Sequence, residues 1–220
     1  MGPPMDYAAA RRNMVDCQIR PNKVTDKAVL DALLSVPREL FVPAGLRGIA
    51  YVDEDIEIAP GRCLMEPMVF ARLLQLAALR PTDVVLDIGC GTGYSAAVLA
   101  RLVNTVVAVE CDAGLAARAT ELLAGLSIDN VVVLEGPLNR GCPAQGPYDA
   151  VFLDGGAATV PAAVLDQLGE GGRLVAVVQR DGLGRATLMR RAGGILSSRI
   201  AFDASVAPLP GFAVEPGFVF

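Results

Sequence analysis

Three glycines stand at alternate positions, Gly89, Gly91 and Gly93, directly after an apolar run that ends in Asp87 and Ile88. Glycine has no Cβ, so the backbone at these positions can turn tightly and lie against a ligand. The residues that follow have helical spacing, and the first turn of a helix offers free N–H groups. A strand, a glycine loop and a helix start in this order predict a ligand site within residues 84–94.

The glycine spacing and the acids around it indicate which ligand this site binds. A dinucleotide loop, G-x-G-x-x-G, would need its third glycine at Tyr94. Asp87 would repel a pyrophosphate, but its carboxylate can reach the amino-acid end of S-adenosylmethionine. Glu110, about twenty residues after the loop, stands where an acid binds ribose hydroxyls, which fits either cofactor. We therefore expect S-adenosylmethionine as cofactor and S-adenosylhomocysteine as product, and the alternative is a glycine-rich turn without a ligand.

The residues expected to bind this cofactor lie in the loop and at the end of the next strand. They are Asp87, Ile88, Gly89, Cys90, Gly91, Gly93, Tyr94, Glu110 and Cys111.

The elements that must hold this loop alternate between strand and helix. Continuous apolar runs predict strands buried on both faces, at residues 84–86, 106–109, 131–134, 150–153 and 173–178. Helical spacing predicts helices between them, at residues 94–102, 113–123 and 160–168. This order predicts an α/β fold with a doubly wound, Rossmann-like, mostly parallel sheet. Strands at 195–203 and 217–220, with no helix between them, predict an antiparallel hairpin that finishes the sheet.

The residues before the sheet predict a helical annex. Helical spacing over 6–35 is interrupted by Pro21, and Asp26 offers a cap for the second helix. Residues 50–60 predict a short extended segment, and Pro67 opens an amphipathic helix. We expect an N-terminal helical annex with a substrate-side loop over residues 1–66. A cofactor-binding domain over 67–220 would pack with it as one compact unit.

Composition excludes several classes of protein. The 220 residues carry a net charge of -5 and a sequence pI of about 4.8, which disfavours nucleic acid as a partner. No segment is apolar enough to span a membrane and the N-terminus has no apolar signal core, so we expect a cytoplasmic protein. Histidine is absent, which excludes Ser-His-Asp and Cys-His hydrolases. The five cysteines lack metal-ligand spacing, so we expect reduced thiols and no metal.

Four further segments carry motifs. They read V-P-R-E-L-F-V-P at 36–43, A-Y-V-D at 50–53, P-Y-D-A at 147–150 and Q-L-G-E-G-G-R-L-V at 167–175. Together with the loop and helix at 86–100, they resemble the protein-L-isoaspartate O-methyltransferase family, and the likeness covers most of the chain. The resemblance implies a monomer that transfers a methyl group to the free carboxylate of isoaspartyl residues in damaged proteins.

At the acceptor end, this sequence departs from the family pattern. The family's T-I-S-Q-P loop reads C-L-M-E-P here, so Met65 replaces a serine whose hydroxyl helps to hold the substrate carboxylate. A thioether does not donate a hydrogen bond. Glu66 adds a negative charge, and Asp154 stands at the end of the fourth strand where the family has a small residue. The resemblance therefore makes Met65, Glu66 and Asp154 the candidate catalytic residues.

At the cofactor end, the family's G-D-G after the third strand reads Gly136-Pro137-Leu138. The acid that contacts adenine in the family is missing, although the backbone of Leu138 can still contribute. The resemblance adds these three residues and Asp154 to the expected cofactor site.

The acceptor remains open between three hypotheses. Methyl transfer to a carboxylate needs no histidine, because a carboxyl with a pKa of about 4 is already ionised near pH 7. Two unpaired acids, Glu66 and Asp154, would instead suit an amine or a hydroxyl, unless they face solvent or pair with Arg62 or Arg72. The alternatives are thus a methyltransferase for a small molecule or another protein group, and a cofactor-binding homologue without catalysis.

Overall fold

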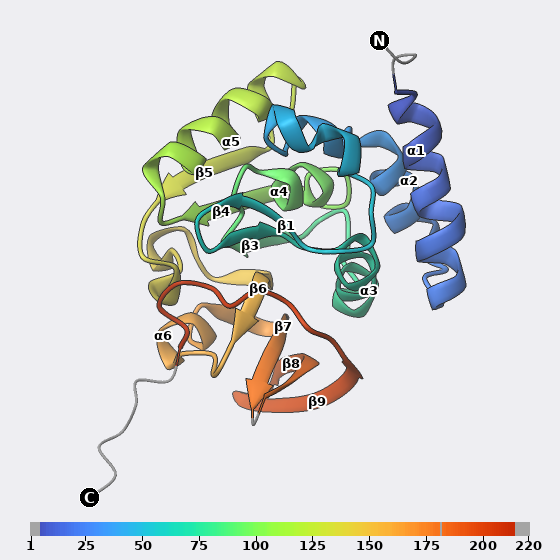
Figure 1. Cartoon of the computed structure of the whole chain (residues 1–220). Coiled ribbons are helices and arrows are strands. Elements are labelled where there is room, and N and C mark those ends of the chain that lie inside the picture. Colours follow the sequence, from blue (N-terminus) through green and yellow to red (C-terminus); the bar gives the residue numbers. More distant parts are fainter. Residues whose placement is uncertain (1–4, 181, 214–220) are drawn as a thin grey trace, which may run out of the picture.

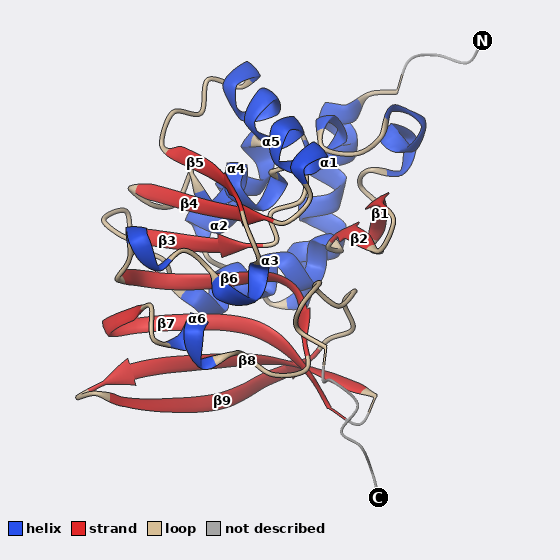
Figure 2. Cartoon of the chain, turned by 90° about the vertical axis from the view of Figure 1, so that its left-hand side faces the viewer, coloured by secondary structure: helices blue, strands red, loops and turns tan. Residues whose placement is uncertain are grey.

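The computed structural model describes residues 5–180 and 182–213, and a seven-stranded sheet forms its centre (Figure 1). The strand order is β5-β4-β3-β6-β7-β8-β9, parallel from β5 to β7 and antiparallel from β7 to β9. The strands are β3 (Val84–Ile88), β4 (Thr105–Glu110), β5 (Val131–Glu135), β6 (Tyr148–Ala157), β7 (Leu168–Arg180), β8 (Leu183–Ala192) and β9 (Ile195–Asp203). Figure 2 shows β5 and β9 at opposite edges of this sheet. The predicted doubly wound fold with an antiparallel finish is confirmed.

Helices pack on the sheet through two apolar clusters, one on each face. The helices are α1 (Tyr7–Asn13), α2 (Lys27–Ser35), α3 (Pro67–Ala77), α4 (Tyr94–Leu99), α5 (Ala113–Gly125) and α6 (Ala162–Leu165). Successive residues of β3 point to opposite faces, so Val85 packs with α2, α3 and α4 while Leu86 packs with α6. This burial on both faces explains why the parallel strands read as continuous apolar runs.

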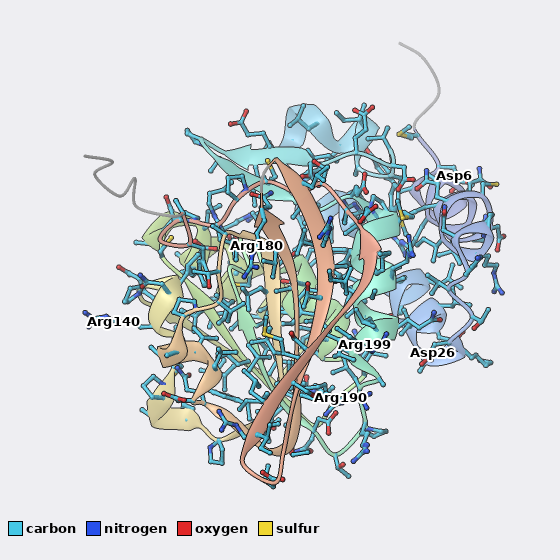
Figure 3. All side chains as sticks on the ribbon, turned by 90° about the horizontal axis from the view of Figure 1, so that it is seen from below. Asp6, Asp26, Arg140, Arg180, Arg190 and Arg199 are labelled. Atoms are coloured by element: carbon cyan, nitrogen blue, oxygen red, sulfur yellow. The ribbon has the colours of Figure 1, made fainter. Side chains whose placement is uncertain are left out.

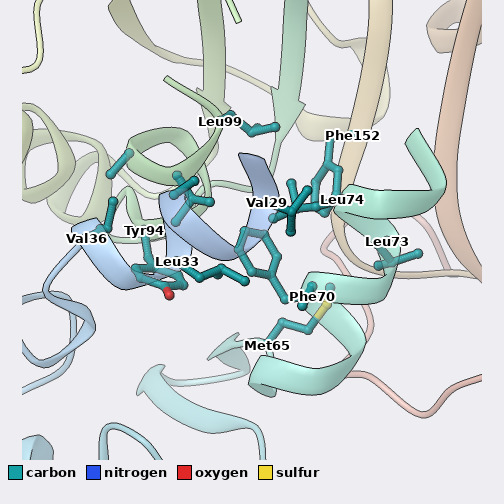
Figure 4. Close-up of a cluster of buried hydrophobic side chains, with 14 of the residues drawn as sticks. Val29, Leu33, Val36, Met65, Phe70, Leu73, Leu74, Tyr94, Leu99 and Phe152 are labelled. Carbon is teal, nitrogen blue, oxygen red and sulfur yellow. The ribbon is translucent and has the colours of Figure 1, made fainter. Parts of the chain in front are cut away.

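The N-terminal helices share the larger cluster. A π-helix (Met14–Ile19) and a 3₁₀ helix (Arg20–Asn22) prolong α1, and the Asp26 carboxylate caps α2 at 2.9 Å from the Ala28 N–H. Figure 4 shows Leu33 of α2 beside Phe70 of α3 in one group of buried side chains. The division after residue 66 stays a prediction, and one cluster contains residues from both sides of it.

Short elements link these layers. Further 3₁₀ helices are Arg38–Leu40, Ala44–Ile49, Leu138–Arg140 and Pro143–Gln145. A separate hairpin is formed by β1 (Ile56–Ala59) and β2 (Arg62–Leu64). Figure 2 shows this hairpin beyond the carboxyl ends of β3 and β4.

The last part of the sheet differs from the expected hairpin. The strand at 195–203 is present as β9, but its antiparallel partner is β8, which the sequence did not predict. The expected strand at 217–220 lies outside the described residues. β8 pairs on both sides yet is buried only at its centre, so it has no continuous apolar run. The helix expected over 160–168 is reduced to α6, because Leu168 already belongs to β7.

Within 5–180 and 182–213, no helix has the length and apolar character needed to cross a bilayer. No group of three or more metal-ligating side chains occurs in the same residues.

Candidate active site

The glycine loop lies where the direction of strand order reverses. β4 and β6 flank β3 on either side, so the residues that follow these three strands meet at one edge of the sheet. Gly89 begins the loop after β3, Cys111 follows β4, and Asp154 lies in the carboxyl half of β6. Ligands of open α/β sheets bind at such a switch point.

The glycines of the loop have two different neighbours. Gly93 has a φ of 94° and caps α4, where a Cβ would meet the Ala119 Cβ of α5 at 3.0 Å. A Cβ on Gly89 would lie 2.6 Å from Cδ2 of Leu209, and one on Gly91 would lie 2.7 Å from Cδ1 of Ile58. Gly93 therefore serves helix packing, whereas Gly89 and Gly91 face side chains that arrive from the β1–β2 hairpin and the C-terminal segment.

Glu110 is fully buried and its carboxylate is surrounded by donors. One oxygen accepts from the Arg62 guanidinium at 2.5 Å and from the Gly91 N–H at 2.8 Å. The other accepts from the N–H groups of Cys111 at 2.8 Å and Asp112 at 3.1 Å. Arg62 also donates to the Gly89 carbonyl at 3.0 Å. The acid predicted to bind ribose thus ties the glycine loop to the hairpin in this conformation.

Asp87 and Asp154 form a buried acid pair. Ser95 Oγ donates to Asp87 Oδ2 at 2.7 Å, and Oδ1 of each aspartate has no hydrogen-bond partner among the described residues. Burial, and then the charge of Asp154, raises the pKa of Asp87 well above its ordinary value. Burial raises the pKa of Asp154 to about 7, against the opposing effects of Ser95, Arg62 and Arg38. The pair therefore retains a proton close to neutral pH.

Three side chains hold the backbone of residues 65–68, where the loop at 63–67 enters α3. Arg38, fully buried, donates to the Met65 carbonyl and to the Ala50 carbonyl, both at 2.7 Å. Asp55 accepts from the Glu66 N–H at 2.8 Å, and Asp53 accepts from the Met68 N–H at 3.1 Å. The motif residues Arg38 and Asp53 thus have a structural explanation, since both set the path of the chain into α3.

Met65 and Glu66 are adjacent in sequence, but their side chains have different surroundings. Met65 is 4% exposed and lines a small cavity together with Asp55, Arg62 and Asp154. Its side chain also joins the buried group around Phe70 (Figure 4).

Glu66 precedes the first residue of α3, is half-buried, and does not line this cavity. Burial, and then the charges of Asp53, Asp55 and Glu54, raises its pKa to about 7. An ion pair of Glu66 with Arg62 or Arg72, one of the alternatives that the sequence left open, is not formed within the described residues, because Arg62 binds Glu110 and Arg72 stacks on Phe202. The structure thus brings together Met65 and Asp154, but not Glu66.

The cavity between these groups is small. Its volume is about 10 Å³, roughly the room that one water molecule needs. Leu209 and Arg62 fill the side that faces the glycine loop. A ligand of nucleoside size therefore requires the hairpin and the C-terminal segment to move away from the loop.

The other predicted cofactor residues have mixed surroundings. Tyr94 and Leu138 are 2% exposed and pack in the two apolar clusters, so only their backbone groups can face a ligand. Ile88 and Cys90 are also buried, and burial, followed by the charge of Asp87, raises the pKa of the Cys90 thiol. Pro137 and Cys111 are exposed, and the Gly136 N–H donates to the Glu110 carbonyl at 2.9 Å. Their roles stay predictions.

Three residues of this region carried no prediction from the sequence, and Arg62 carried only that of an ion pair with Glu66 or Asp154. Arg62 lies in the β1–β2 hairpin and Asp55 directly precedes it. Ser95 is the second residue of α4, and Leu209 follows β9 by six residues. The first three are polar side chains that are buried or half-buried, and only their tertiary contacts reveal this. The motif V-P-R-E could have pointed to Arg38 as a residue of this region. An arginine is rarely buried unless its guanidinium has an acceptor.

The arrangement can be compared with known proteins. A family model described as Protein-L-isoaspartate(D-aspartate) O-methyltransferase matches residues 9–209. A protein-L-isoaspartate O-methyltransferase of Roseiflexus castenholzii is 40% identical over 207 residues, which are 94% of this chain and 94% of that protein. The protein with this name in Methylorubrum extorquens is 40% identical over 209 residues, 94% of this chain and 91% of that one.

Solved structures of similar proteins have the same fold. One protein-L-isoaspartate O-methyltransferase has a TM-score of 0.78 and 25% identity, over 93% of this chain and 66% of its own. A Plasmodium falciparum protein assigned to the same enzyme class, in complex with S-adenosyl-L-homocysteine, has a TM-score of 0.79 and 20% identity, over 94% and 99%. With the family model and the relatives at 40% identity, these matches identify the chain as a member of the protein-L-isoaspartate O-methyltransferase family.

Proposed function

We propose that this protein transfers the methyl group of S-adenosylmethionine to the carboxylate of isoaspartyl residues in other proteins. The observation that carries the proposal is Asp87, a buried acid with one oxygen that has no partner within residues 5–180 and 182–213, next to a glycine loop at the switch point of the sheet. Family membership adds the reaction class, because relatives with 40% identity along most of the chain carry this enzyme's name.

The residues present fit S-adenosylmethionine. Asp87 Oδ1 and Asp154 Oδ1 are buried acceptors with no partner in the described part of the chain, and a cationic ligand supplies what such acceptors lack. Gly89 and Gly91 provide a backbone surface on which a Cβ would obstruct the approach. Glu110 would bind the ribose hydroxyls once Arg62 withdraws from it. When bound, the cofactor supplies a methyl carbon activated by a sulfonium.

The chain's own residues would position the acceptor and exclude water. Arg38 and Arg62 are the two cations near Asp154, and their charges favour an anionic acceptor in the same place. Met65 covers the cavity with an apolar side chain, which keeps water from the reacting atoms. An isoaspartyl carboxylate needs no base, so positioning supplies most of the rate.

A second acceptor has one observation in its favour. Asp154 lines the cavity with a pKa of about 7, which is the value that suits a general base at neutral pH. Met65 offers no hydroxyl to hold a carboxylate. An amine or hydroxyl acceptor, on a small molecule or another protein group, is therefore the alternative.

Calorimetry and methyl transfer together test both halves of the proposal. S-adenosylhomocysteine should bind the wild-type protein, and Asp87→Asn should weaken binding about tenfold to a hundredfold, because a charge-assisted hydrogen bond contributes about 1.5–3 kcal/mol. Asp129→Asn, at an exposed loop position, is the matched control and should change nothing. If the wild type shows no binding, the cofactor assignment is wrong.

The acceptor is identified with radiolabelled S-adenosylmethionine. An isoaspartyl peptide should accept label, and the same sequence with a normal aspartyl residue should not. Transfer to a lysine or serine peptide, with none to the isoaspartyl peptide, would favour the alternative acceptor. We further propose a monomer that acts in the cytoplasm, which size-exclusion chromatography with light scattering and cell fractionation can test.

A further inference from the structure

A groove of about 350 Å³ lies between α3 and the β8–β9 hairpin, apart from the candidate active site. Its lining contains four cations and no acid: Lys23, Arg72, Arg190 and Arg199, beside the uncharged Asn22, Gln75, Leu76, Ala78 and Phe202. The chain as a whole has a net charge of -5. This local excess of positive charge is therefore opposite in sign to the rest of the molecule.

The cations converge from three separate parts of the chain. Arg190 and Arg199 lie on adjacent antiparallel strands, where Arg190 pairs with Ser197 and Arg199 with Leu188. This register makes the two arginines diagonal neighbours on one face, about 7–8 Å apart at the backbone. Figure 3 labels both on this hairpin, with Arg140 on the opposite side of the molecule.

The other two cations are held by specific contacts. The Arg72 guanidinium lies 3.6 Å from the centre of the Phe202 ring, which leaves its N–H edge free to donate. Gln75 accepts from the Thr25 N–H at 2.7 Å and donates to the Lys23 carbonyl at 3.0 Å. The segment that carries Lys23 is thereby attached to α3 beside the groove.

Two acids that lie close to groove residues in the sequence, Asp26 and Asp203, have other neighbours. Asp26 caps α2 through the N–H groups of Ala28 and Val29, and Asp203 lies 4.0 Å from Arg185. The four cations of the groove have no ion pair with any described residue, although Arg191, the neighbour of Arg190, lies 3.8 Å from Asp166. Four unpaired like charges around one hollow repel one another, and a bound anion removes that cost.

The end of α3 does not oppose an anion either. The last carbonyls of a helix are negative, which would normally disfavour an anion beside Ala78. Here Arg173 donates to the Ala77 carbonyl at 2.7 Å and to the Ala78 carbonyl at 2.9 Å. The carbonyl charge at this helix end is therefore compensated by a residue outside the groove.

We propose that this groove binds a compact polyanion that carries two or more phosphate groups. Guanidinium forks match the oxygens of phosphates, and three of the four cations are arginines. The volume corresponds to a small ligand, and all four cations line this one groove, which favours a compact ligand over an extended acidic peptide. A free polyphosphate and the phosphates of a nucleotide share this chemistry.

Calorimetry with sodium tripolyphosphate at 50 mM salt tests the proposal. The wild-type protein should bind one equivalent, and the double variant Arg190→Ser/Arg199→Ser should bind at least tenfold more weakly. Both side chains are exposed, so folding should be unaffected. The matched control, Arg140→Ser/Arg180→Ser, also removes two exposed arginines and should bind as the wild type does. Binding should weaken as salt rises.

Three comparisons separate the possible ligands. Equal affinity for tripolyphosphate and ATP supports recognition of the phosphates alone, and tighter binding of ATP supports a nucleotide as the source. The proposal is overturned if tripolyphosphate does not bind, if the control variant loses as much affinity as the groove variant, or if a hexaglutamate peptide binds as tightly. No readout involves methyl transfer, so the outcome is independent of the proposed function.

Discussion

Replacement of Asp154 by asparagine should make the protein more stable at neutral and higher pH. The Asp154 carboxyl is 6% exposed, and burial raises its pKa from 3.8 to about 7. Above pH 7 the folded protein must hold a buried carboxylate, whereas the unfolded chain ionises the same group freely in water. Asparagine has nearly the same shape and carries no charge, so it removes this unfavourable contribution.

The size of the effect follows from the two pKa values. For an acid whose pKa is raised on folding, stability is greatest below pH 3.8 and falls as the pH rises towards 7. The loss is about 1.4 kcal/mol for each pH unit in this interval and then stops. The difference of about 3.2 units, multiplied by 1.36, sets an upper bound of about 4 kcal/mol at pH 8.

Guanidinium chloride unfolding, followed by circular dichroism from pH 5 to 8, measures this effect. The stability of Asp154→Asn relative to wild type should increase by up to about 1.4 kcal/mol per pH unit until pH 7 and remain constant above it. The chain has no histidine, so no histidine titrates in this range. Glu66 does titrate there, because its pKa is also raised to about 7, and Glu66→Gln measures its separate share.

Asp203→Asn is the control, because the Asp203 side chain is 91% exposed and lies 4.0 Å from Arg185. Its stability relative to wild type should not vary over this range. If the Asp154→Asn difference were equally independent of pH, the buried acid pair with Asp87 would not hold a proton, and the reasoning would be refuted.

Three further predictions concern the same site. The kcat/KM for an isoaspartyl peptide should fall as pH rises through 7, because the ionised Asp154 repels an anionic acceptor, and Asp154→Asn should flatten that profile. Leu209→Ala should increase affinity for S-adenosylhomocysteine about tenfold to a hundredfold by calorimetry. A ligand must displace Leu209 from the glycine loop, and exposing a leucine costs about 1.5–3 kcal/mol. Leu188→Ala, at a position that is also buried, should leave this affinity unchanged. Arg38→Met should lower the free energy of unfolding by about 2–6 kcal/mol in denaturant titrations and reduce methyl transfer, since the Ala50 and Met65 carbonyls both lose their buried donor, at about 1–3 kcal/mol each.

The parallel part of the fold was predictable because its strands are buried on both faces. Continuous apolar runs located β3, β4 and β5 within one or two residues at each end, and the glycines between β3 and α4 located the loop. β8 was not predictable on the same grounds. Only three of its residues, Ala186 to Leu188, are buried. Charged residues before and after them in the sequence interrupt the apolar pattern that would predict a strand.

The candidate site was predictable only where it lies next to the glycine loop in the sequence. Asp87 and Glu110 end adjacent parallel strands, and pairing of the strands brings those ends together without further information. Arg62 reaches the same place from a hairpin 48 residues before Glu110, and Leu209 reaches it from the far end of the chain. No local sequence pattern predicts contacts of this kind, because they depend on how the helices and strands pack in the folded chain.

The neighbours Met65 and Glu66 show a related limit. The resemblance made both of them candidate catalytic residues, but Glu66 is the N-cap of α3, which begins at Pro67. Asp55 accepts the Glu66 N–H and repels its carboxylate, while Arg38 binds the Met65 carbonyl. The two side chains therefore have different surroundings. At the start of α3, a shift of one residue determines that Met65, and not Glu66, lines the cavity with Asp154.

The balance of charge in the site explains why a cationic cofactor and an anionic acceptor can share it. Asp55, Asp87, Glu110 and Asp154 stand against Arg38 and Arg62, so the site has a net charge of about -1 when the acid pair holds one proton.

S-adenosylmethionine, with a sulfonium, an ammonium and a carboxylate, carries one net positive charge and would neutralise the site. An isoaspartyl carboxylate would then approach a neutral environment beside two arginines instead of an excess of acids. Asp154, the acid by which this chain departs from the expected family pattern, is thus compatible with an isoaspartyl acceptor as long as the Asp87–Asp154 pair keeps its proton. Ionisation of Asp154 would disfavour binding of that acceptor.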